Sequence, residues 1–281
     1  MEDFSAWIGR TETRHDIAAA APLRGLAALL DHDASASPPA TVPPLGHWLY
    51  FLPDARQSAI GSDGHPRRDD AGLLPPVPLP RRMWAGGRVE FLAPIRVGAA
   101  LTRVTTITAI RARHGASGDL LFVTLQHDIA ADGTPAIREA QDLVYRAPAD
   151  AAATPAVAAT IPVAPEPADA VRRMSPDPVL LFRYSALTFN AHRIHYDRDY
   201  ARDVEGYAGL VVQGPLIATL LMDHGLQSMP GIAPRHFHFR AEAPLIDGAP
   251  VDLCLLRQAD GARLWARDAA GRTTMRAELT R

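Results

Sequence analysis

The sequence contains no lysine and only one cysteine. All 29 basic side chains are arginines. Together with the many alanines and prolines, this indicates a bias in overall composition rather than a need for arginine chemistry. The single cysteine excludes an intramolecular disulfide and a cysteine metal cluster. Because Cys254 lies in the apolar run VDLCLL, we expect it to be a small core residue on a strand.

The sequence also lacks a strong charge imbalance and long hydrophobic runs. Its formal net charge is −2, which gives no basis for nucleic acid or an anionic membrane surface as a partner. No apolar run is long enough to span a bilayer, and the N-terminus lacks the basic and apolar regions of a signal peptide. We therefore expect a cytoplasmic protein. A chain of 281 residues suffices for one large domain or two small ones.

One short pattern, A-P-[I/L]-x-x-G, occurs twice, at 93–98 and again at 243–248. Each copy precedes a series of β-rich runs that are separated by glycine-containing turns, which is typical of antiparallel meanders. A repeated pattern of this kind indicates an internal duplication. The expected strands cover residues 100–112, 120–130, 136–146, 251–257, 264–268 and 273–279.

One apolar helix is expected before each meander, at 16–30 in the first half and at 215–227 in the second. Pro215 suits the first turn of a helix, and Gly214 suits the position just before it. A helix followed by an antiparallel meander, twice, predicts an α+β fold in which each sheet wraps around a central helix. This is the double hotdog arrangement, whose two sheets can join edge to edge and cover exposed strand edges.

The stretch 147–178 separates the two halves and is dominated by alanine and proline. Proline fixes φ and removes a hydrogen-bond donor, so this composition disfavours helix and sheet. We expect an extended surface linker between an N-terminal hotdog unit, 1–146, and a C-terminal unit, 179–281.

The densest cluster of polar and aromatic residues is segment 182–197, which contains Asn190, His192 and His195. Conjugate hydration needs a group that takes a proton from water and returns one to carbon near neutral pH, which imidazole can do. A neighbouring amide can orient the water. The alternative is a surface loop that caps a helix near 197–202. No third ligand stands at a telling spacing from the two histidines, so we predict no metal site.

A second candidate segment, 209–215, ends in Gly214 at the expected start of the helix. The first N–H groups of a helix lack internal partners and lie at the positive end of its dipole. A thioester carbonyl that approached the glycine would be polarised there, and enolate-like charge on its oxygen would be stabilised. A helix start that binds no ligand is the alternative.

The segments 189–197 (FNAHRIHYD) and 207–215 (YAGLVVQGP) together resemble the MaoC-like hydratase/dehydratase superfamily. They are closer to its two-hotdog branch, which includes mesaconyl-C4-CoA and itaconyl-CoA hydratases, and residues 78–88 (PLPRRMWAGGR) are similar to that branch's first-half signature. The resemblance covers most of the chain outside the linker. It implies a hydro-lyase without a cofactor that reversibly adds water to a short enoyl-CoA, with a C5 dicarboxyl-CoA as the expected substrate.

In the (R)-specific enoyl-CoA hydratases of this superfamily, the Asp and His of D-x-N-P-[I/L]-H activate water. In register, the resemblance places Asn190 at the Asp, His192 at the Asn, Arg193 at the Pro and His195 at the catalytic His. An amide cannot act as a base. We therefore expect His195 to transfer the proton and Asn190 to position the water, with His192 as a secondary candidate.

The resemblance also implies the residues that bind the substrate. Gly214 falls on the helix-start glycine that polarises the thioester, and Gln213 stands where those enzymes usually have a histidine. His192, Arg193 and Tyr184 complete the expected substrate-binding set. A distal carboxylate needs a forked arginine donor, and the candidates for it are Arg81, Arg82, Arg88, Arg183 and Arg193.

The first half contains no copy of the catalytic segment. By analogy we expect it to have lost its chemistry and to form the acyl-CoA tunnel. Three alternatives stay open: a thioesterase, a (3R)-hydroxyacyl thioester dehydratase of longer chains, and a non-catalytic acyl-CoA-binding protein. A thioesterase needs a carboxylate near the central helix, where Asp223 lies deeper than the helix start. Two fused units already mimic a dimer, so both a monomer and a homodimer are compatible with the sequence.

Overall fold

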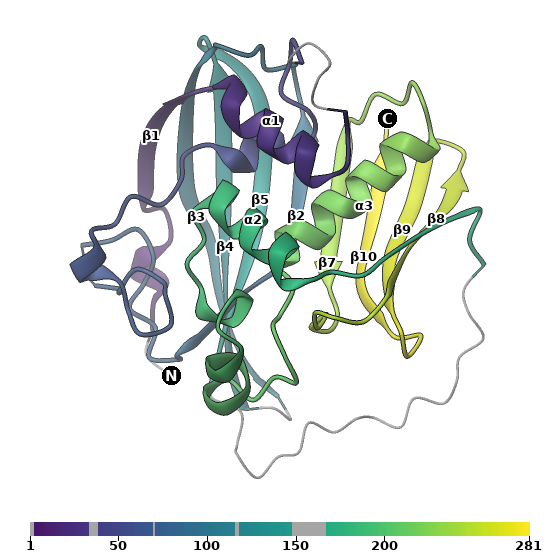
Figure 1. Cartoon of the computed structure of the whole chain (residues 1–281). Coiled ribbons are helices and arrows are strands. Elements are labelled where there is room, and N and C mark those ends of the chain that lie inside the picture. The colour runs from purple at the N-terminus through teal and green to yellow at the C-terminus, as the bar shows by residue number, and fades with distance from the viewer. Residues whose placement is uncertain (1–2, 34–38, 70, 116–117, 148–166) are drawn as a thin grey trace.

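The computed structural model describes residues 3–33, 39–69, 71–115, 118–147 and 167–281, and its main feature is one ten-stranded antiparallel sheet (Figure 1). No helix among these residues is long and apolar enough to cross a bilayer. The strands are β1 (Thr11–Ile17), β2 (Arg81–Phe91), β3 (Ala100–Gly115), β4 (Gly118–Ala131), β5 (Thr134–Arg146), β6 (Ala170–Met174), β7 (His236–Ala241), β8 (Val251–Gln258), β9 (Gly261–Asp268) and β10 (Thr273–Thr280).

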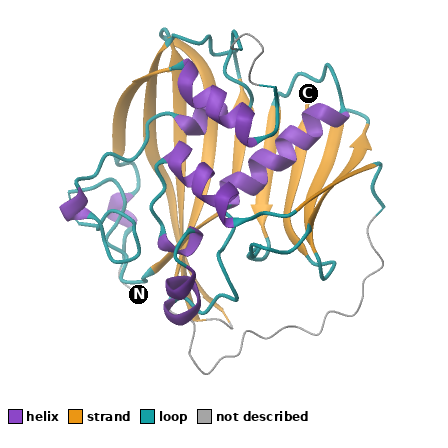
Figure 2. Ribbon diagram, viewed as in Figure 1, coloured by secondary structure: helices purple, strands orange, loops and turns teal. Residues whose placement is uncertain are grey.

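The α-helices lie on one face of this sheet (Figure 2). They are α1 (Ala20–Leu29), α2 (Pro178–Thr188) and α3 (Gly214–Ser228). Shorter turns are the 3₁₀ helices η1 (Ser5–Trp7), η2 (Gly46–Leu49), η3 (Gln57–Ala59) and η4 (Arg193–His195), and the π-helical turn η5 (Tyr200–Val204).

The strand order shows that the sheet consists of two equivalent units. From one edge to the other it runs β1-β3-β4-β5-β2-β7-β10-β9-β8-β6. Counted from its outer edge inward, each unit therefore has five strands in corresponding order, and the units meet through β2 and β7. The predicted edge-to-edge joining is thereby confirmed. The predicted strands of both meanders are also present, as β3, β4, β5, β8, β9 and β10.

The repeated sequence pattern has the same structural role in both units. After β2, the amides of residues 92 and 93 donate to the carbonyl of Ala136; after β7, the amides of 242 and 243 donate to that of Thr274. Ile95 and Leu245, at the third position of each copy, are both buried. The internal duplication predicted from six residues is therefore confirmed by matching hydrogen bonds.

The two units differ in their central helix. In the second unit, ten consecutive residues of α3 from Leu216 to Gly225 are buried, and the helix packs on β8, β9 and β10. In the first unit the expected helix exists as α1, but it follows β1 just as α2 follows β6. The backbone amide of Val42 donates to the carbonyl of Ile95, as that of Val212 donates to the carbonyl of Leu245. Val42 therefore corresponds to Val212, and the single turn η2 that follows it takes the place of α3. Among the described residues, therefore, no long helix fills the concave face of the first sheet.

The expected linker is shorter than its composition indicated. Residues 148–166 lie outside the described residues, but 170–174 form β6, which pairs with β8. Residues 168–175 contain no proline, so a strand can form there inside a proline-rich surrounding. Helix α2 starts at Pro178, where the Asp177 carboxylate accepts from the amide of Leu180 at 2.8 Å. Cys254 is fully buried on β8, as expected.

A pair of glycines permits the junction between the units. A Cβ atom on Gly86 would lie 2.6 Å from the carbonyl oxygen of Phe239, and one on Gly87 would lie 2.8 Å from the Phe239 ring. Both contacts are shorter than van der Waals distance, so β7 reaches its place beside β2 because these two residues lack side chains.

We predict that Gly86→Ala destabilises the whole fold. The added methyl group would collide with backbone at the junction, which cannot move without breaking the β2–β7 ladder, and overpacking of this kind costs roughly 1–3 kcal/mol. Urea denaturation followed by circular dichroism measures the change. Gly72→Ala is the control, because its Cβ would meet Asp69 at an ordinary 3.6 Å. Equal stability of both variants would contradict the prediction.

Candidate active site

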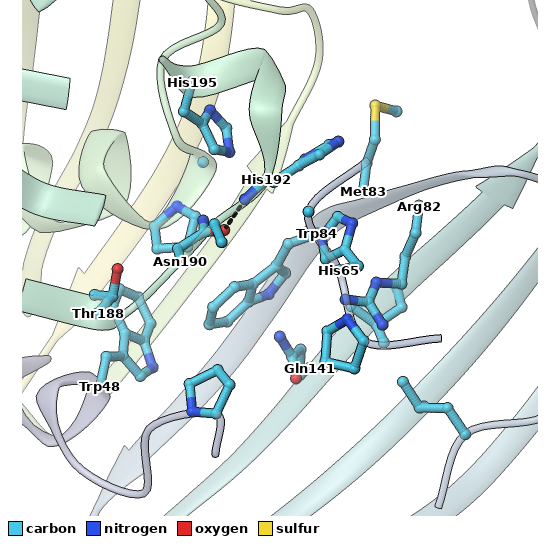
Figure 3. A pocket seen from close by; sticks show the side chains of 18 of the residues that line it. Trp48, His65, Arg82, Met83, Trp84, Gln141, Thr188, Asn190, His192 and His195 are labelled. Atoms are coloured by element: carbon cyan, nitrogen blue, oxygen red, sulfur yellow. Dashed lines mark hydrogen bonds between the residues drawn. The ribbon is translucent and has the colours of Figure 1, made fainter. Parts of the chain in front are cut away.

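A cavity of about 1220 Å³ lies between the two units and is lined by residues from both (Figure 3). Its walls come from η2, the loop before β2 and strands β2 to β5 of the first unit, and from segment 188–196 and the start of α3 in the second. The predicted site residues among its lining are Tyr184, Asn190, His192, Arg193, His195 and Gly214. The structure therefore brings together six of the seven residues that the sequence singled out.

His195 is presented by η4 and is buried. Its Nδ1 lies 2.7 Å from the carbonyl oxygen of Val211. A carbonyl can only accept, so Nδ1 carries the hydrogen and Nε2 is left with a lone pair. Burial lowers the pKa of His195 to about 4, helped by the nearby His65 and opposed by the Val211 carbonyl. His195 is therefore neutral near pH 7, with Nε2 able to take a proton.

Asn190 is positioned by the end of α2. The helix is capped at its end by Phe189, which has φ +47°, and the backbone N–H of Asn190 donates to the carbonyl of Ser185 at 2.9 Å. The side-chain Oδ1 of Asn190 accepts from the backbone amide of His192 at 3.1 Å, the dashed line in Figure 3. This bond fixes the orientation of the amide and leaves the Nδ2 group to donate. A water beside Asn190 would therefore accept from Nδ2 and turn its own protons elsewhere.

Gly214 is the first residue of α3, so its N–H has no partner within the helix. A Cβ atom placed there would meet the carbonyl oxygen of Trp84 at 3.6 Å, an ordinary contact, as its nearest described neighbour. Trp84 itself stands at a β-bulge of β2. The start of α3 therefore faces the cavity with room for a small group in front of it.

Gln213 differs from the expectation that it binds substrate. It is fully buried and does not line the cavity, and its Nε2 donates to the carbonyl of Leu181 and the hydroxyl of Ser185, both at 2.9 Å. These contacts join the start of α3 to α2, which indicates a structural role. Tyr184 lines the cavity but is also buried, and burial raises the pKa of its hydroxyl well above its usual range.

Arg193 holds the first unit against the second. Its guanidinium pairs with Asp197 at 2.7 Å and donates to the carbonyl of Ser62 at 3.0 Å, while its backbone amide donates to the carbonyl of Asp63 at 2.9 Å. Next to these, Gly64 has φ +91°, and a Cβ on it would lie 1.8 Å from the carbonyl oxygen of Ala191. A loop of the first unit is thus packed directly on the segment that contains His192 and His195.

This loop brings a histidine that the sequence analysis missed. The His65 ring lies 4.2 Å from that of His192, which in turn lies 5.3 Å from that of His195, centroid to centroid. The expectation that the first half forms the acyl-CoA tunnel stays a prediction, and this half contributes an imidazole to the cavity. The sequence DGHP at 63–66 is typical of a polar turn, and its distance of more than a hundred residues from His192 gives no local signal.

His65 is paired with a carboxylate. Its Nδ1 and its backbone amide both bond the Asp63 side chain at 3.0 Å. Burial lowers the pKa of His65, as does the positive charge of Arg82. Burial and the neighbouring His65 and His195 lower the pKa of His192. Burial acts to raise the pKa of Asp63, but the bonds from His65 outweigh it and keep this pKa well below its usual range.

Donor atoms of Asp63, His65 and His192 lie within 4.8 Å of one another. This group includes His192 but not His195, so it is not a third ligand added to the histidine pair of the sequence. Two of the three residues already bond each other through Nδ1 and the carboxylate. We interpret the group as an Asp–His pair that faces His192 and assign no metal to it.

Two comparisons with known proteins show the family of this chain. The model of the family of hydroxyacyl-thioester dehydratases type 2 matches residues 45–247. The mesaconyl-C4-CoA hydratase of Chloroflexus aurantiacus is 45% identical over 283 residues, which cover 99% of this chain and 97% of the relative.

Solved structures support the fold. A MaoC-like dehydratase from Phytophthora capsici has a TM-score of 0.65 at 14% identity and covers 97% of this chain, with 95% of its own length covered. A Mycobacterium tuberculosis protein described as having a double hotdog fold has a TM-score of 0.52 at 15% identity, with the same coverage of both chains. The predicted double hotdog fold is thereby confirmed.

We predict that the His195 ring stays neutral down to about pH 4. An NMR titration of the ring C–H signals measures this, and the signal missing from His195→Ala gives the assignment. The folded state then binds fewer protons than an unfolded chain, whose histidine has a pKa of 6.5. Between these two values the free energy of unfolding therefore decreases as the pH is lowered. Titration of the ring near pH 6.5 would contradict the assignment.

Proposed function

The chain belongs to the hydroxyacyl-thioester dehydratase type 2 family, and we propose that it hydrates mesaconyl-C4-CoA, a branched C5 dicarboxyl thioester. Dehydratases of this kind are hydro-lyases, which add water to or remove it from the α,β bond of an acyl thioester. One observation carries the activity: His195, whose Nε2 has a lone pair, and Gly214, whose N–H has no partner within α3, line the same cavity. The substrate is supported by the relative that is 45% identical over nearly the whole chain.

The chemistry of this substrate sets what the site must do. In mesaconyl-C4-CoA the thioester is conjugated to a double bond whose β carbon carries a methyl group and a carboxylate. Hydration places the oxygen of water on this β carbon and a proton on the α carbon. The site therefore needs a base for water, a donor for the thioester oxygen and a place for the carboxylate.

The residues of the cavity supply the first two. The thioester oxygen accepts from the N–H of Gly214 at the positive end of α3. Asn190 Nδ2 donates to a water, His195 Nε2 takes one proton of that water, and its oxygen bonds to the β carbon. The charge moves onto the thioester oxygen, and the proton on His195 then passes to the α carbon. One imidazole on one face of the substrate gives syn addition.

The environment of His195 suits this role. A base must be deprotonated when it meets the substrate, and the buried ring is neutral near pH 7. Its tautomer is set by Val211, so Nε2 needs no rearrangement before it accepts. Positioned acid/base groups of this kind contribute roughly 10²–10⁴ in rate.

The thioesterase alternative loses its candidate carboxylate. Asp223 on α3 is buried, forms ion pairs with Arg172 at 2.6 Å and His32 at 2.8 Å, and does not line the cavity. The carboxylate therefore bonds to β6 and to the segment after α1, away from the start of α3.

We predict that the protein hydrates mesaconyl-C4-CoA and that His195→Ala lowers kcat by roughly 10²–10⁴. Loss of absorbance of the conjugated thioester follows the reaction, and itaconyl-CoA, crotonyl-CoA and longer enoyl-CoAs complete the substrate panel. A thiol reagent detects any free CoA, which a thioesterase would release.

His114→Ala is the matched control, because this exposed histidine pairs with Asp119 and does not line the cavity. It should keep the rate of the unmodified protein. Near-normal rates in His195→Ala would disprove the role of the imidazole, and preference for long chains would favour the (3R)-hydroxyacyl thioester dehydratase alternative.

We predict that Gly214→Ala separates activity from stability. The methyl group fits without steric conflict inside the protein, so the melting temperature should not fall. The same group occupies the space through which the thioester oxygen reaches the N–H. Loss of one such donor typically lowers kcat by roughly 10²–10³. A variant with unchanged kcat would place the thioester elsewhere.

A further inference from the structure

The carboxylate of the proposed substrate needs a receptor, and its position is constrained by chemistry. This inference rests on the proposed function. The carboxylate is bonded directly to the β carbon, which is the carbon that water attacks. Its receptor must therefore lie beside His195. An anion at that carbon also repels electron-rich nucleophiles, so a cation that neutralises it would favour the addition.

The structure selects one arginine among the five candidates. Three of them are held by carboxylates of this chain: Arg81 by Glu205 at 2.8 Å, Arg88 by Asp142 at 2.8 Å and Arg193 by Asp197 at 2.7 Å. Arg183 is exposed on α2 and does not line the cavity. Arg82 lines the cavity, and no hydrogen bond or ion pair of its side chain is found within the described parts of the chain.

Arg82 also lies at the catalytic end of the cavity. Its positive charge acts on both His65 and His192. In Figure 3 Arg82 and His65 occupy the same side of the pocket, with His192 between them and His195. A guanidinium here can bind a carboxylate through two parallel N–H donors.

His65 is arranged to donate to the same anion. Its Nδ1 is occupied by Asp63, so Nε2 is the nitrogen that can bond a ligand. The Asp63 carboxylate behind the ring stabilises an imidazolium, as carboxylates do when they hold a charged histidine. The ring is fixed in place because its loop is bonded to Arg193 and packs on Ala191.

We propose that Arg82 and His65 together form the receptor for the carboxylate on the β carbon, with Asp63 supporting His65 from behind. Arg82 binds it as a forked donor, and His65 binds it through Nε2–H. Because a neutral His65 has its hydrogen on Nδ1, this bond requires that His65 gain a proton when the substrate binds.

A bound carboxylate makes this proton uptake favourable. Asp63 attracts a positive charge on the ring, while Arg82 and Arg68 repel it, and His192 lies against the same ring. In the absence of ligand, burial and the two arginines lower the pKa of His65 below its ordinary 6.5. A bound carboxylate adds a second negative charge and offsets the arginines. The uptake should therefore be visible near pH 7.5, where the free ring is neutral.

The test compares two saturated thioesters that cannot react. Methylsuccinyl-CoA with the thioester on C4 carries the methyl group and the carboxylate of the substrate, and isovaleryl-CoA replaces that carboxylate by a second methyl group. Isothermal titration calorimetry in buffers of different ionisation enthalpy measures the protons taken up by each. We expect uptake approaching one proton with methylsuccinyl-CoA and none with isovaleryl-CoA.

Variants assign the uptake to the receptor. His65→Asn should abolish it, and Arg82→Gln should weaken methylsuccinyl-CoA binding roughly tenfold to hundredfold, as expected for a lost charge-assisted bond. Binding of isovaleryl-CoA should not change in either variant, which also shows that they are folded. Arg88→Gln on the same strand is the control, because its charge is held by Asp142 outside the cavity.

The outcomes separate this inference from the proposed function. If the protein hydrates mesaconyl-C4-CoA but His65→Asn keeps the proton uptake, or Arg82→Gln keeps the preference over isovaleryl-CoA, the receptor assignment is wrong and the function stands. If the unmodified protein hydrates 3-methylcrotonyl-CoA and not mesaconyl-C4-CoA, the proposed substrate is wrong, and the receptor assignment falls with it.

Discussion

The site depends on the junction between β2 and β7. Because Gly86 and Gly87 have no side chains, the two strands can pair while the carbonyl and the ring of Phe239 lie close to these two residues. The same strand β2 carries Arg82 into the cavity and brings the carbonyl of Trp84 close to the start of α3. The relative position of the two units is therefore set by backbone packing at this junction. The polar contacts of Arg193 and Arg81 with the other unit add to it.

The loss of a long helix in one unit creates the space for a substrate. In the second unit α3 fills the concave face of its sheet and presents Gly214 at one end. In the first unit η2 is a single turn, and the inner face of β3 to β5 lines the cavity instead. In the proposed mechanism the two units therefore have separate tasks. The helix whose start polarises the thioester fills the volume that the acyl group needs, so one unit cannot do both.

Local patterns predicted the parts of the structure that depend on neighbours in sequence. The strands of both meanders and helix α3 followed from β-rich runs and turn residues, and two motifs singled out His195 and Gly214, which line one cavity. Contacts over long sequence distances could not be read in this way. Arg81 and Arg82 are adjacent and chemically identical, yet one pairs with Glu205 and the other faces the cavity. Folding brings a carboxylate beside Arg81, which leaves the guanidinium of Arg82 as the one that can bind an anion in the cavity.

The amide at position 190 becomes intelligible once the proposed substrate is considered. In related hydratases an aspartate at this position shares the proton transfer, but a carboxylate there would face a substrate that carries its own carboxylate on the reacting carbon. Two like charges a few ångströms apart in a buried cavity raise the pKa of one of them or expel the ligand. Asn190 keeps the shape and the bond to the His192 amide while removing this repulsion. In the proposed mechanism the cost is one base, and His195 acts alone with its neutral form stabilised by burial.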